Sequence, residues 1–550
     1  AAPYRKGQVL HSVFAAAQIQ SSSFLIPTSF AMAELHESQQ WRWSTISGHG
    51  ESCTGPRRCV VIDVPLNYPG LLPMANNENN ASHLSQTLRW TDAFALSMAV
   101  SGSIFASFGF ALGALGPIGA LLLWVGSAAI GACQNWIFLE VSAMFPNKPG
   151  GVAMIATEGW RRRCALVGPI ASFGYWLGWS AVLAIVGVSA GSLIQAQWFP
   201  EQIWSYQLGS VNIGLAQFIG VGLIVLFWQF NRLGVQMAAS ASKYMGALLL
   251  VPILVLAFAP LYSDAWKFEH FQNAWSNLPV ADWNTGRTAL MWLFLIAWSA
   301  YGTEMCAAFG PEYRSKKDMR LALITSGGYT VAVFAAVAFS LGGLADQQAA
   351  IDNPNGFFIG AFDAILGSEY SSFFISTLLV GLFMGLNASL ADGSRALYGM
   401  ALDGLTIRQL GVLNKHQVPG RCMAVAVVIN IAMVFLLSSP LAILVTANIG
   451  YVVSIFFALT GFLWLRKDAA DIERPVKLRA GWIPIAWVFS LLTGLIVLVG
   501  AASTELVGYG GTKELLMGIG ILLLSVVLYG LRKLQDRFQP GDLKTHQSGH

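Results

Sequence analysis

Small polar residues interrupt two apolar runs of this sequence that lie far apart. The first run contains Ser101-Gly102-Ser103, and the sixth contains Trp298-Ser299-Ala300-Tyr301-Gly302-Thr303-Glu304. A helix in hydrocarbon satisfies its own backbone groups, so a break is tolerated only where the freed groups face a ligand or a water-filled cavity. Breaks at corresponding places in two halves of a membrane chain point to the binding site of a transporter.

The first break offers donors to an anion. We expect free N–H groups near Ser103, Ile104 and Phe105, with the positive end of the helix dipole, to hold a carboxylate. Gly102 belongs to the same predicted site, and the hydroxyls of Ser101 and Ser103 add donors. The alternative is that these hydroxyls bond back to the preceding turn and only bend the helix.

The second break offers acceptors to a cation. The carbonyl groups of Trp298, Ser299, Ala300 and Tyr301, next to Gly302, can accept hydrogen bonds from an ammonium group. The indole of Trp298 can cover the ligand and attract a cation through its ring face. Most of the nineteen tryptophans, by contrast, are expected to be interface anchors or core residues.

Several other polar residues fall within or beside apolar runs. Acids within a membrane are costly and face a cavity or a partner, so Glu304 is expected to bind substrate ammonium, take up a proton or pair with another helix. Asn387 either lines the site or joins helices. Glu140 is expected to pair with loop groups, and Arg395 and Asp403 to form a gate or scaffold ion pair.

The composition identifies the elements that must position these residues. Of 550 residues, 55% are hydrophobic and only 11% are charged, whereas soluble domains carry about 25% charged residues. A spanning helix needs about 20 mostly apolar residues. The sequence therefore predicts an all-α polytopic membrane protein with about twelve spans: 91–112, 116–145, 168–194, 209–230, 240–262, 288–309, 320–344, 371–397, 421–438, 440–465, 481–501 and 511–532.

Lys and Arg gather in alternate loops. Clusters such as Arg161-Arg162-Arg163 and Arg466-Lys467 follow even-numbered segments, while the opposite loops hold chiefly Lys267, Arg287 and Lys513. The positive-inside rule then places both termini in the cytoplasm of a cell-membrane protein.

The ends of the chain differ from the apolar part. Residues 1–88 form a polar extension without a run long enough to span a membrane, and we expect it to be disordered. A natural start at Met74 is one hypothesis for this segment. Residues 89–538 form the predicted transporter domain, and residues 539–550 form a C-terminal tail.

Other classes of protein lack support in the sequence. There is no Walker loop, HExxH or GxSxG, so neither ATP-driven pumping nor hydrolysis has visible machinery. The six cysteines include no CxxC pair, and the histidines show no metal-ligand spacing. We therefore predict no enzyme, no cofactor, no metal and no nucleic-acid partner; the partners are a small molecule and the lipid bilayer.

A set of short motifs, in order along residues 90–535, resembles the amino acid/polyamine/organocation (APC) permeases. They are Glu140 to Pro146 with Gly150-Gly151, Ala300 to Glu304 with Pro311-Glu312, Asn387-Ala388-Ser389 with Ser394-Arg395 and Asp403-Gly404, and the pairs Val418-Pro419 and Arg474-Pro475. Two stretches depart from the family pattern: Ser101-Gly102-Ser103 replaces a glycine-rich run, and Gly310 to Arg314 lacks the usual paired acids.

The resemblance implies a LeuT-like five-plus-five inverted repeat, with broken helices 1 and 6 and two extra helices. It also implies that Trp298 stacks on the substrate, and that Lys243 holds segments 1, 5 and 8 together in place of a sodium ion, as an ion-coupling residue. The alternative for Lys243 is that its long side chain carries the charge to the membrane interface.

We therefore expect a secondary active transporter that moves an amino acid or related amine by proton symport or exchange. A sodium-coupled symporter of the same fold, a non-transporting amino acid sensor and a channel are the alternatives. Both a cationic and a neutral aliphatic substrate agree with the predicted site residues.

Overall fold

The computed structural model describes residues 84–538, apart from residues 203, 209–210, 273–282, 345–346, 353–356, 437–439 and 508–510. All of them belong to the second of two units, Ala75–His550. Met74, the predicted extension up to residue 83 and the predicted tail lie outside the described residues. Leu88 is fully buried, and its N–H donates to the Glu312 carbonyl at 2.9 Å.

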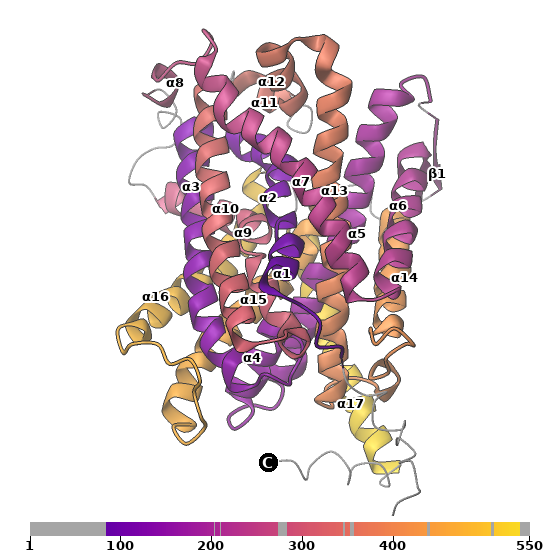
Figure 1. Ribbon diagram of the computed structural model, residues 1–550, viewed down its shortest axis with the longest axis vertical. Coiled ribbons are helices and arrows are strands. Elements are labelled where there is room, and N and C mark those ends of the chain that lie inside the picture. The colour runs from indigo at the N-terminus through magenta and orange to yellow at the C-terminus, as the bar shows by residue number, and fades with distance from the viewer. Residues whose placement is uncertain are drawn as a thin grey trace, which may run out of the picture. The chain divides into compact units, whose positions relative to one another are not determined.

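The described part of the chain is mostly helical (Figure 1). The α-helices are α1 (Trp90–Ser97), α2 (Ala99–Gly102), α3 (Ile104–Met144), α4 (Gly151–Trp160), α5 (Val167–Trp198), α6 (Leu215–Arg232), α7 (Val235–Phe258), α8 (Glu269–Gln272), α9 (Trp283–Ala300), α10 (Lys316–Leu344), α11 (Gln347–Asp352), α12 (Phe357–Leu366), α13 (Ser371–Leu402), α14 (Gly420–Leu436), α15 (Pro440–Asp468), α16 (Trp482–Leu495) and α17 (Thr512–Phe538). Shorter 3-10 and π pieces are η2 (Ala259–Tyr262), η3 (Thr303–Glu312), η4 (Ser368–Tyr370), η5 (Arg408–Leu410), η6 (Ile496–Gly500) and η7 (Ala501–Val507).

One small sheet makes the prediction of an all-α protein wrong in detail. β1 (Ser205–Leu208) pairs antiparallel with β2 (Val211–Gly214), and Tyr206 lies opposite Ile213. The predicted segment 209–230 is therefore helical only from Leu215. The sequence carries the signal for this hairpin, because aromatic and β-branched residues flank a Gly-Ser pair.

Ten helices within the described residues are long and apolar enough to cross a membrane. The first predicted segment is divided among α1, α2 and the start of α3, and α14 has only 17 residues, so neither reaches the length of a spanning helix by itself. Inside α3, Gly116 has a φ of 71° before Pro117, which separates the predicted spans 91–112 and 116–145. A polytopic membrane protein follows from this composition and length.

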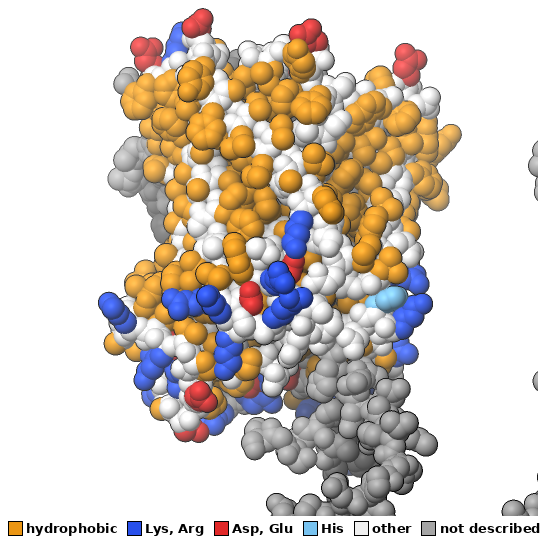
Figure 2. All heavy atoms as spheres, in the orientation of Figure 1, with side chains coloured by type: hydrophobic (Ala, Val, Ile, Leu, Met, Phe, Trp, Pro, Cys, Tyr) orange, Lys and Arg blue, Asp and Glu red, His pale blue; other side chains and the backbone are white. Residues whose placement is uncertain are grey.

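Burial differs strongly among the helices. In the central helix α15, 83% of the apolar stretch is buried, whereas in α17 only 17% is buried. The surface in Figure 2 carries broad apolar areas, as lipid contact requires, and its Lys and Arg side chains gather toward the end of the bundle that holds α4 in Figure 1.

The sixth segment breaks within its length. α9 ends at Ala300, Gly302 adopts a left-handed conformation with a φ of 33°, and the chain continues as the 3-10 helix η3. A residue with a side chain rarely adopts this conformation, which is why glycine suits the position. The predicted break is therefore present in segment 6.

Candidate functional site

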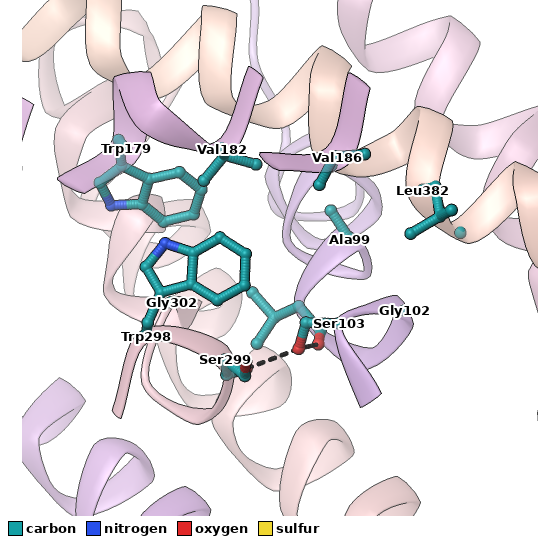
Figure 3. Close-up of a pocket in the computed structure, with 13 residues that line it drawn as sticks. Ala99, Gly102, Ser103, Trp179, Val182, Val186, Trp298, Ser299, Gly302 and Leu382 are labelled. Carbon is teal, nitrogen blue, oxygen red and sulfur yellow. Dashed lines mark hydrogen bonds between the residues drawn. The ribbon is translucent and has the colours of Figure 1, made fainter. Parts of the chain in front are cut away.

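A small cavity lies between the first and sixth segments, against α5 and α13 (Figure 3). Its wall consists of Ala99, Val100, Gly102, Ser103, Trp179, Val182, Val186, Trp298, Ser299, Gly302, Gly381, Leu382 and Gly385. The cavity has a volume of about 50 Å³. That is room for about three to five water molecules, so a ligand that fits this form of the cavity is small.

Among the described residues, none that lines the cavity has an ionisable side chain. Val182 and Val186 of α5 face the same space as Leu382 of α13 in Figure 3, and two indoles cover another side. An ionised side chain buried in such a site without a partner would cost several kcal/mol. The wall favours a ligand whose own side chain is apolar.

The serines of the first segment make mainly local hydrogen bonds. Ser101 Oγ donates to the Met98 carbonyl at 2.7 Å, and the Ser103 N–H donates to the Val100 carbonyl at 3.1 Å. The Ser103 hydroxyl lies 2.6 Å from the Val100 carbonyl oxygen and 2.7 Å from that of Ser299. The first segment keeps right-handed helical dihedral angles at Met98 and Ser103, and its serine hydroxyls bond back to the preceding turn, as the alternative interpretation of the serines predicts.

A close contact between two helices explains Gly102. A Cβ atom at this position would lie 3.0 Å from the Gly381 Cα atom and 3.1 Å from its carbonyl oxygen. These are backbone atoms and cannot move away independently. Gly102 therefore allows the first segment to pack directly on α13 beside the cavity.

The break in the sixth segment leaves backbone groups beside the cavity that bind side chains of other segments. The Gly302 N–H donates to Tyr451 Oη at 3.1 Å, and the Ser299 carbonyl accepts the Ser103 hydroxyl. Ser299 Oγ also lies 2.8 Å from Ser107 Oγ. The first and sixth segments are therefore joined by hydroxyl contacts at the cavity.

Two indoles lie side by side over the cavity in Figure 3, those of Trp298 and Trp179. The indole N–H of Trp298 is buried and has no hydrogen-bond partner among the described residues. A buried donor without a partner costs about 1 to 3 kcal/mol. This donor is available to a ligand.

Five of the predicted substrate-binding residues line the cavity: Gly102, Ser103, Trp298, Ser299 and Gly302. The others are buried but lie outside its wall: Ser101, Ile104, Ala300, Tyr301, Glu304 and Asn387.

Asn387 joins helices. Its side-chain amide donates to the Ala238 carbonyl and to Ser242 Oγ, both at 2.8 Å, and its oxygen accepts from Asn231 at 2.8 Å. It thereby connects α13 with α6 and α7, which fits the second of its two predicted roles.

Lys243 forms an ion pair with Asp92 of α1. The Lys243 side chain is 46% exposed, whereas that of Asp92 is 5% exposed. The structure therefore links segments 1 and 5 through this lysine. Its exposure agrees with the alternative in which the long side chain carries the charge outward.

The sequence offers Trp179 only as a minor candidate, and sequence reasoning missed the two valines of α5, the cavity residues of α13 and three buried polar groups: Tyr175, Asp392 and Tyr451. Trp179, Val182 and Val186 follow one another at three- and four-residue spacing, as do Leu382 and Gly385. This spacing places them on one helix face, but every buried helix face has it. Only Asp392, an acid inside an apolar run, carried a distinctive signal.

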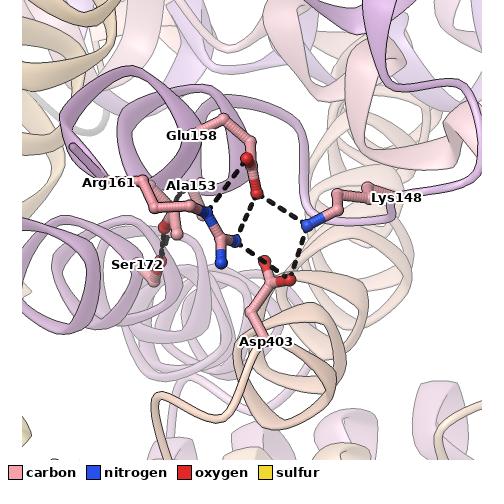
Figure 4. A network of polar contacts seen from close by, with 7 residues as sticks. Lys148, Ala153, Glu158, Arg161, Ser172 and Asp403 are labelled. Carbon is pink, nitrogen blue, oxygen red and sulfur yellow. Dashed lines mark hydrogen bonds and ion pairs between the residues drawn. The ribbon is translucent and has the colours of Figure 1, made fainter. Parts of the chain in front are cut away.

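Ion pairs gather at the end of the bundle that holds α4 (Figure 4). Lys148 Nζ lies 2.6 Å from Glu158 and 2.9 Å from Asp403, and Arg161 contacts both acids. Burial raises the pKa of Asp403 despite the two cations. Although burial lowers the pKa of Lys148, Asp403 and Glu158 raise it above the ordinary value.

The ion pairs of Glu140 agree with its predicted structural role, whereas Arg395 pairs with Glu312 and Asp403 pairs with Lys148 and Arg161. Glu140 contacts Arg466 at 2.5 Å and Arg474 at 3.4 Å. Arg395 binds Glu312 through two hydrogen bonds of 2.6 and 2.8 Å, and both side chains are almost fully buried.

Comparisons with known proteins agree with this architecture. A family model described as "Amino acid permease" matches residues 88–526. The amino-acid permease RocE of Bacillus subtilis is 23% identical over 368 residues, which cover 63% of this chain and 72% of that protein. The branched-chain amino acid permease BcaP of Lactococcus lactis is 23% identical over 466 residues, which cover 76% of this chain and 94% of that protein.

Proposed function

This chain belongs to the amino acid permease family, and we propose that it carries a neutral amino acid with an apolar side chain across the cytoplasmic membrane as a secondary active transporter. The observation that carries this proposal is the uncharged cavity between the broken sixth segment and the first segment. Irregular backbone inside a membrane bundle belongs where a ligand binds.

Each part of an amino acid has a partner in this proposal. The ammonium group bonds to carbonyl oxygens at the break, including that of Ser299. The carboxylate accepts hydrogen bonds from the hydroxyl of Ser103 and from the indole N–H of Trp298, which has no partner among the described residues. The side chain lies against Val182, Val186 and Leu382. The name of the Lactococcus relative, a branched-chain amino acid permease, agrees with such a wall.

The finer architecture is also part of the proposal. We infer twelve spans with both termini in the cytoplasm, a polar N-terminal extension, and a LeuT-like five-plus-five repeat in which α16 and α17 follow the second half. The low burial of α17 and the gathering of basic side chains near α4 support this arrangement. Alternating access is then movement of one group of helices against the other around the cavity.

Transport is proposed to be coupled to protons or to proceed by exchange. In this proposal Lys243, through its ion pair with Asp92, ties the first segment to α7 without a sodium ion. Lys243→Gln should then reduce uptake while the protein remains folded.

The test is uptake by purified protein in liposomes. We expect valine, leucine or isoleucine to accumulate under an inward proton gradient, or to exchange against internal substrate, and a sodium gradient alone to have no effect. Lysine and polyamines should compete poorly. Preferred uptake of cations would refute the proposed substrate class, strict sodium dependence would refute the coupling, and binding without transport would favour a sensor.

A further inference from the structure

Two buried carboxyl groups lie outside the wall of the cavity, and each accepts a hydrogen bond from a tyrosine. Tyr451 Oη donates to Glu304 at 2.6 Å, and Tyr175 Oη donates to Asp392 at 3.3 Å. The rings of the two tyrosines lie side by side, with centroids 6.0 Å apart. Asp392 is fully buried, and its second carboxyl oxygen has no hydrogen-bond partner among the described residues.

Arg395, the basic residue closest to Asp392 in the sequence, is already paired with Glu312. Arg395 lies one helical turn away, but its guanidinium binds Glu312 through two short hydrogen bonds and donates to the Ala391 carbonyl at 2.7 Å. If both Glu304 and Asp392 were ionised, this cluster of one cation and three carboxylates would carry two uncompensated negative charges. A buried site does not hold such charges without a large cost, and it binds a proton instead.

The hydrogen bonds distinguish the two acids. Glu304 accepts a bond of 2.6 Å, the length of a strong bond to a carboxylate. Within the described part of the chain, Asp392 accepts only a longer bond, and its other carboxyl oxygen has no hydrogen-bond partner. The remaining titratable groups around Asp392 are Tyr175, Tyr451, Cys306 and the Arg395–Glu312 pair, and none of them supplies a free positive charge.

We propose that Asp392 is the proton-binding site that couples proton movement to substrate movement, an inference that rests on the proposed transport function. The carboxylate of Asp392 takes a proton from water on one side of the membrane, forming an O–H bond, and returns it to water on the other side when the surrounding helices separate. No electrons are exchanged, and no co-reactant other than water is needed.

The contacts also show how substrate can act on this site. The Gly302 N–H, in the wall of the cavity, donates to Tyr451 Oη, which donates in turn to Glu304. The ring of Tyr451 packs beside that of Tyr175, the partner of Asp392. A change at the break in segment 6 is therefore passed through two tyrosines to both acids.

The test compares Asp392→Asn with wild type in liposomes, using valine as substrate. A pH difference of one unit supports up to about tenfold accumulation at one proton per substrate. We expect Asp392→Asn to lower the accumulation ratio to about one, while exchange of internal for external valine stays within about threefold. Asp352→Asn, which changes an exposed carboxyl on α11, should accumulate valine like wild type. Undiminished accumulation by Asp392→Asn would overturn the inference.

A second measurement does not depend on transport. Infrared spectra of purified wild type at neutral pH should contain the band of a protonated carboxyl that is protected from solvent, and this band should be lost in Asp392→Asn. If that variant does not fold, Tyr175→Phe should shift the pH dependence of accumulation to higher pH, since ionised Asp392 loses its hydrogen bond. Wild type without such a band would refute the inference even if valine is transported, whereas absence of transport with the band present would refute only the proposed function.

Discussion

The size of the substrate side chain should be set at Gly385 of α13. A Cβ atom added there would lie 3.6 Å from one Val186 side-chain carbon and 3.8 Å from a Val182 carbon, which are ordinary van der Waals distances. Gly385→Ala therefore adds a methyl group to the wall of the cavity without forcing the helices apart. In a helix interior the change from glycine to alanine stabilises by about 0.5 to 1 kcal/mol.

The added methyl group is expected to weaken the binding of large substrates and not the packing of the protein. The cavity is small, about 50 Å³, so a substrate that fills it must compete with the new group. One methylene more or less in an apolar pocket changes discrimination by about 1 to 3 kcal/mol, or roughly 10- to 200-fold. We expect kcat/KM for leucine and isoleucine to fall at least about tenfold relative to that for alanine.

The assay is initial uptake of radiolabelled leucine, valine and alanine into liposomes, with Gly328→Ala as the matched control. Gly328 lies on α10, where an added Cβ atom has no neighbour within 4 Å. The control therefore makes the same glycine-to-alanine substitution in a helix outside the cavity. Loss of leucine uptake with alanine uptake retained would support the assignment. An equal loss for all three substrates, or no change in a folded protein, would show that the side chain does not lie against α13.

Three further outcomes follow from contacts at and around the site. Trp298→Ala should raise KM by about fivefold or more in the uptake assay, since about 1 to 3 kcal/mol of ring contact and donor is lost; an unchanged KM would remove this indole from the site. A double-mutant cycle of Lys243→Gln with Asp92→Asn should give a coupling energy of at most about 1 kcal/mol in thermal unfolding, because the lysine is 46% exposed, and a much larger value would contradict the exposed geometry. Burial raises the pKa of the folded-state Asp403 carboxyl above its unfolded value. The folded protein is therefore favoured by the neutral form of Asp403: this stabilisation is complete at pH values below the unfolded pKa, and it is lost as the pH rises through the folded pKa. The Tm values of wild type and Asp403→Asn should then agree in acid and separate toward neutral pH with the variant the more stable; the opposite order would mean that the ion pairs outweigh burial.

The residues beside the backbone break could be predicted from sequence because a break has few acceptable causes in a membrane. Glycine and polar residues inside an apolar run identified Gly102, Ser103, Trp298, Ser299 and Gly302, and all five line the cavity. The same pattern could not show that the first segment keeps helical dihedral angles at Ser103 while the sixth breaks at Gly302. A serine hydroxyl can donate to a ligand or bond back to its own helix, and only the three-dimensional structure distinguishes these two roles.

The opposite wall could not be predicted, since its chemistry is that of any core. Val182, Val186 and Leu382 have the types and spacing of ordinary buried residues, and no local feature separates a cavity from a packed interface. The hydrogen-bond partners of the buried polar groups could not be predicted for a different reason. Tyr175 and Asp392 are 217 positions apart, so their contact depends on how α5 and α13 pack.

The helix boundaries show a similar division between local and long-range information. Long apolar runs predicted α10, α13 and α15 closely, because length and composition decide them. The predicted span 209–230 starts before α6, because it includes strand β2 of the hairpin. The partner of Lys243 was also missed, since Asp92 lies on another helix far away in sequence.

The contact between Ser103 and Ser299 links substrate binding to movement of the first segment relative to the sixth. The Ser103 hydroxyl has one hydrogen and two carbonyl oxygens within 2.7 Å, one in its own segment and one in the sixth. A ligand carboxylate that accepts this hydrogen must replace at least the bond to Ser299, so binding exchanges a link between the two segments for a link through the ligand. Meanwhile the break in segment 6 is held by Tyr451, which also binds Glu304. In the proposed mechanism the substrate therefore acts at the break in segment 6 and the proton acts at Asp392 of α13. The contacts of Tyr451 with Gly302 and with the ring of Tyr175 link the two positions, as coupling requires.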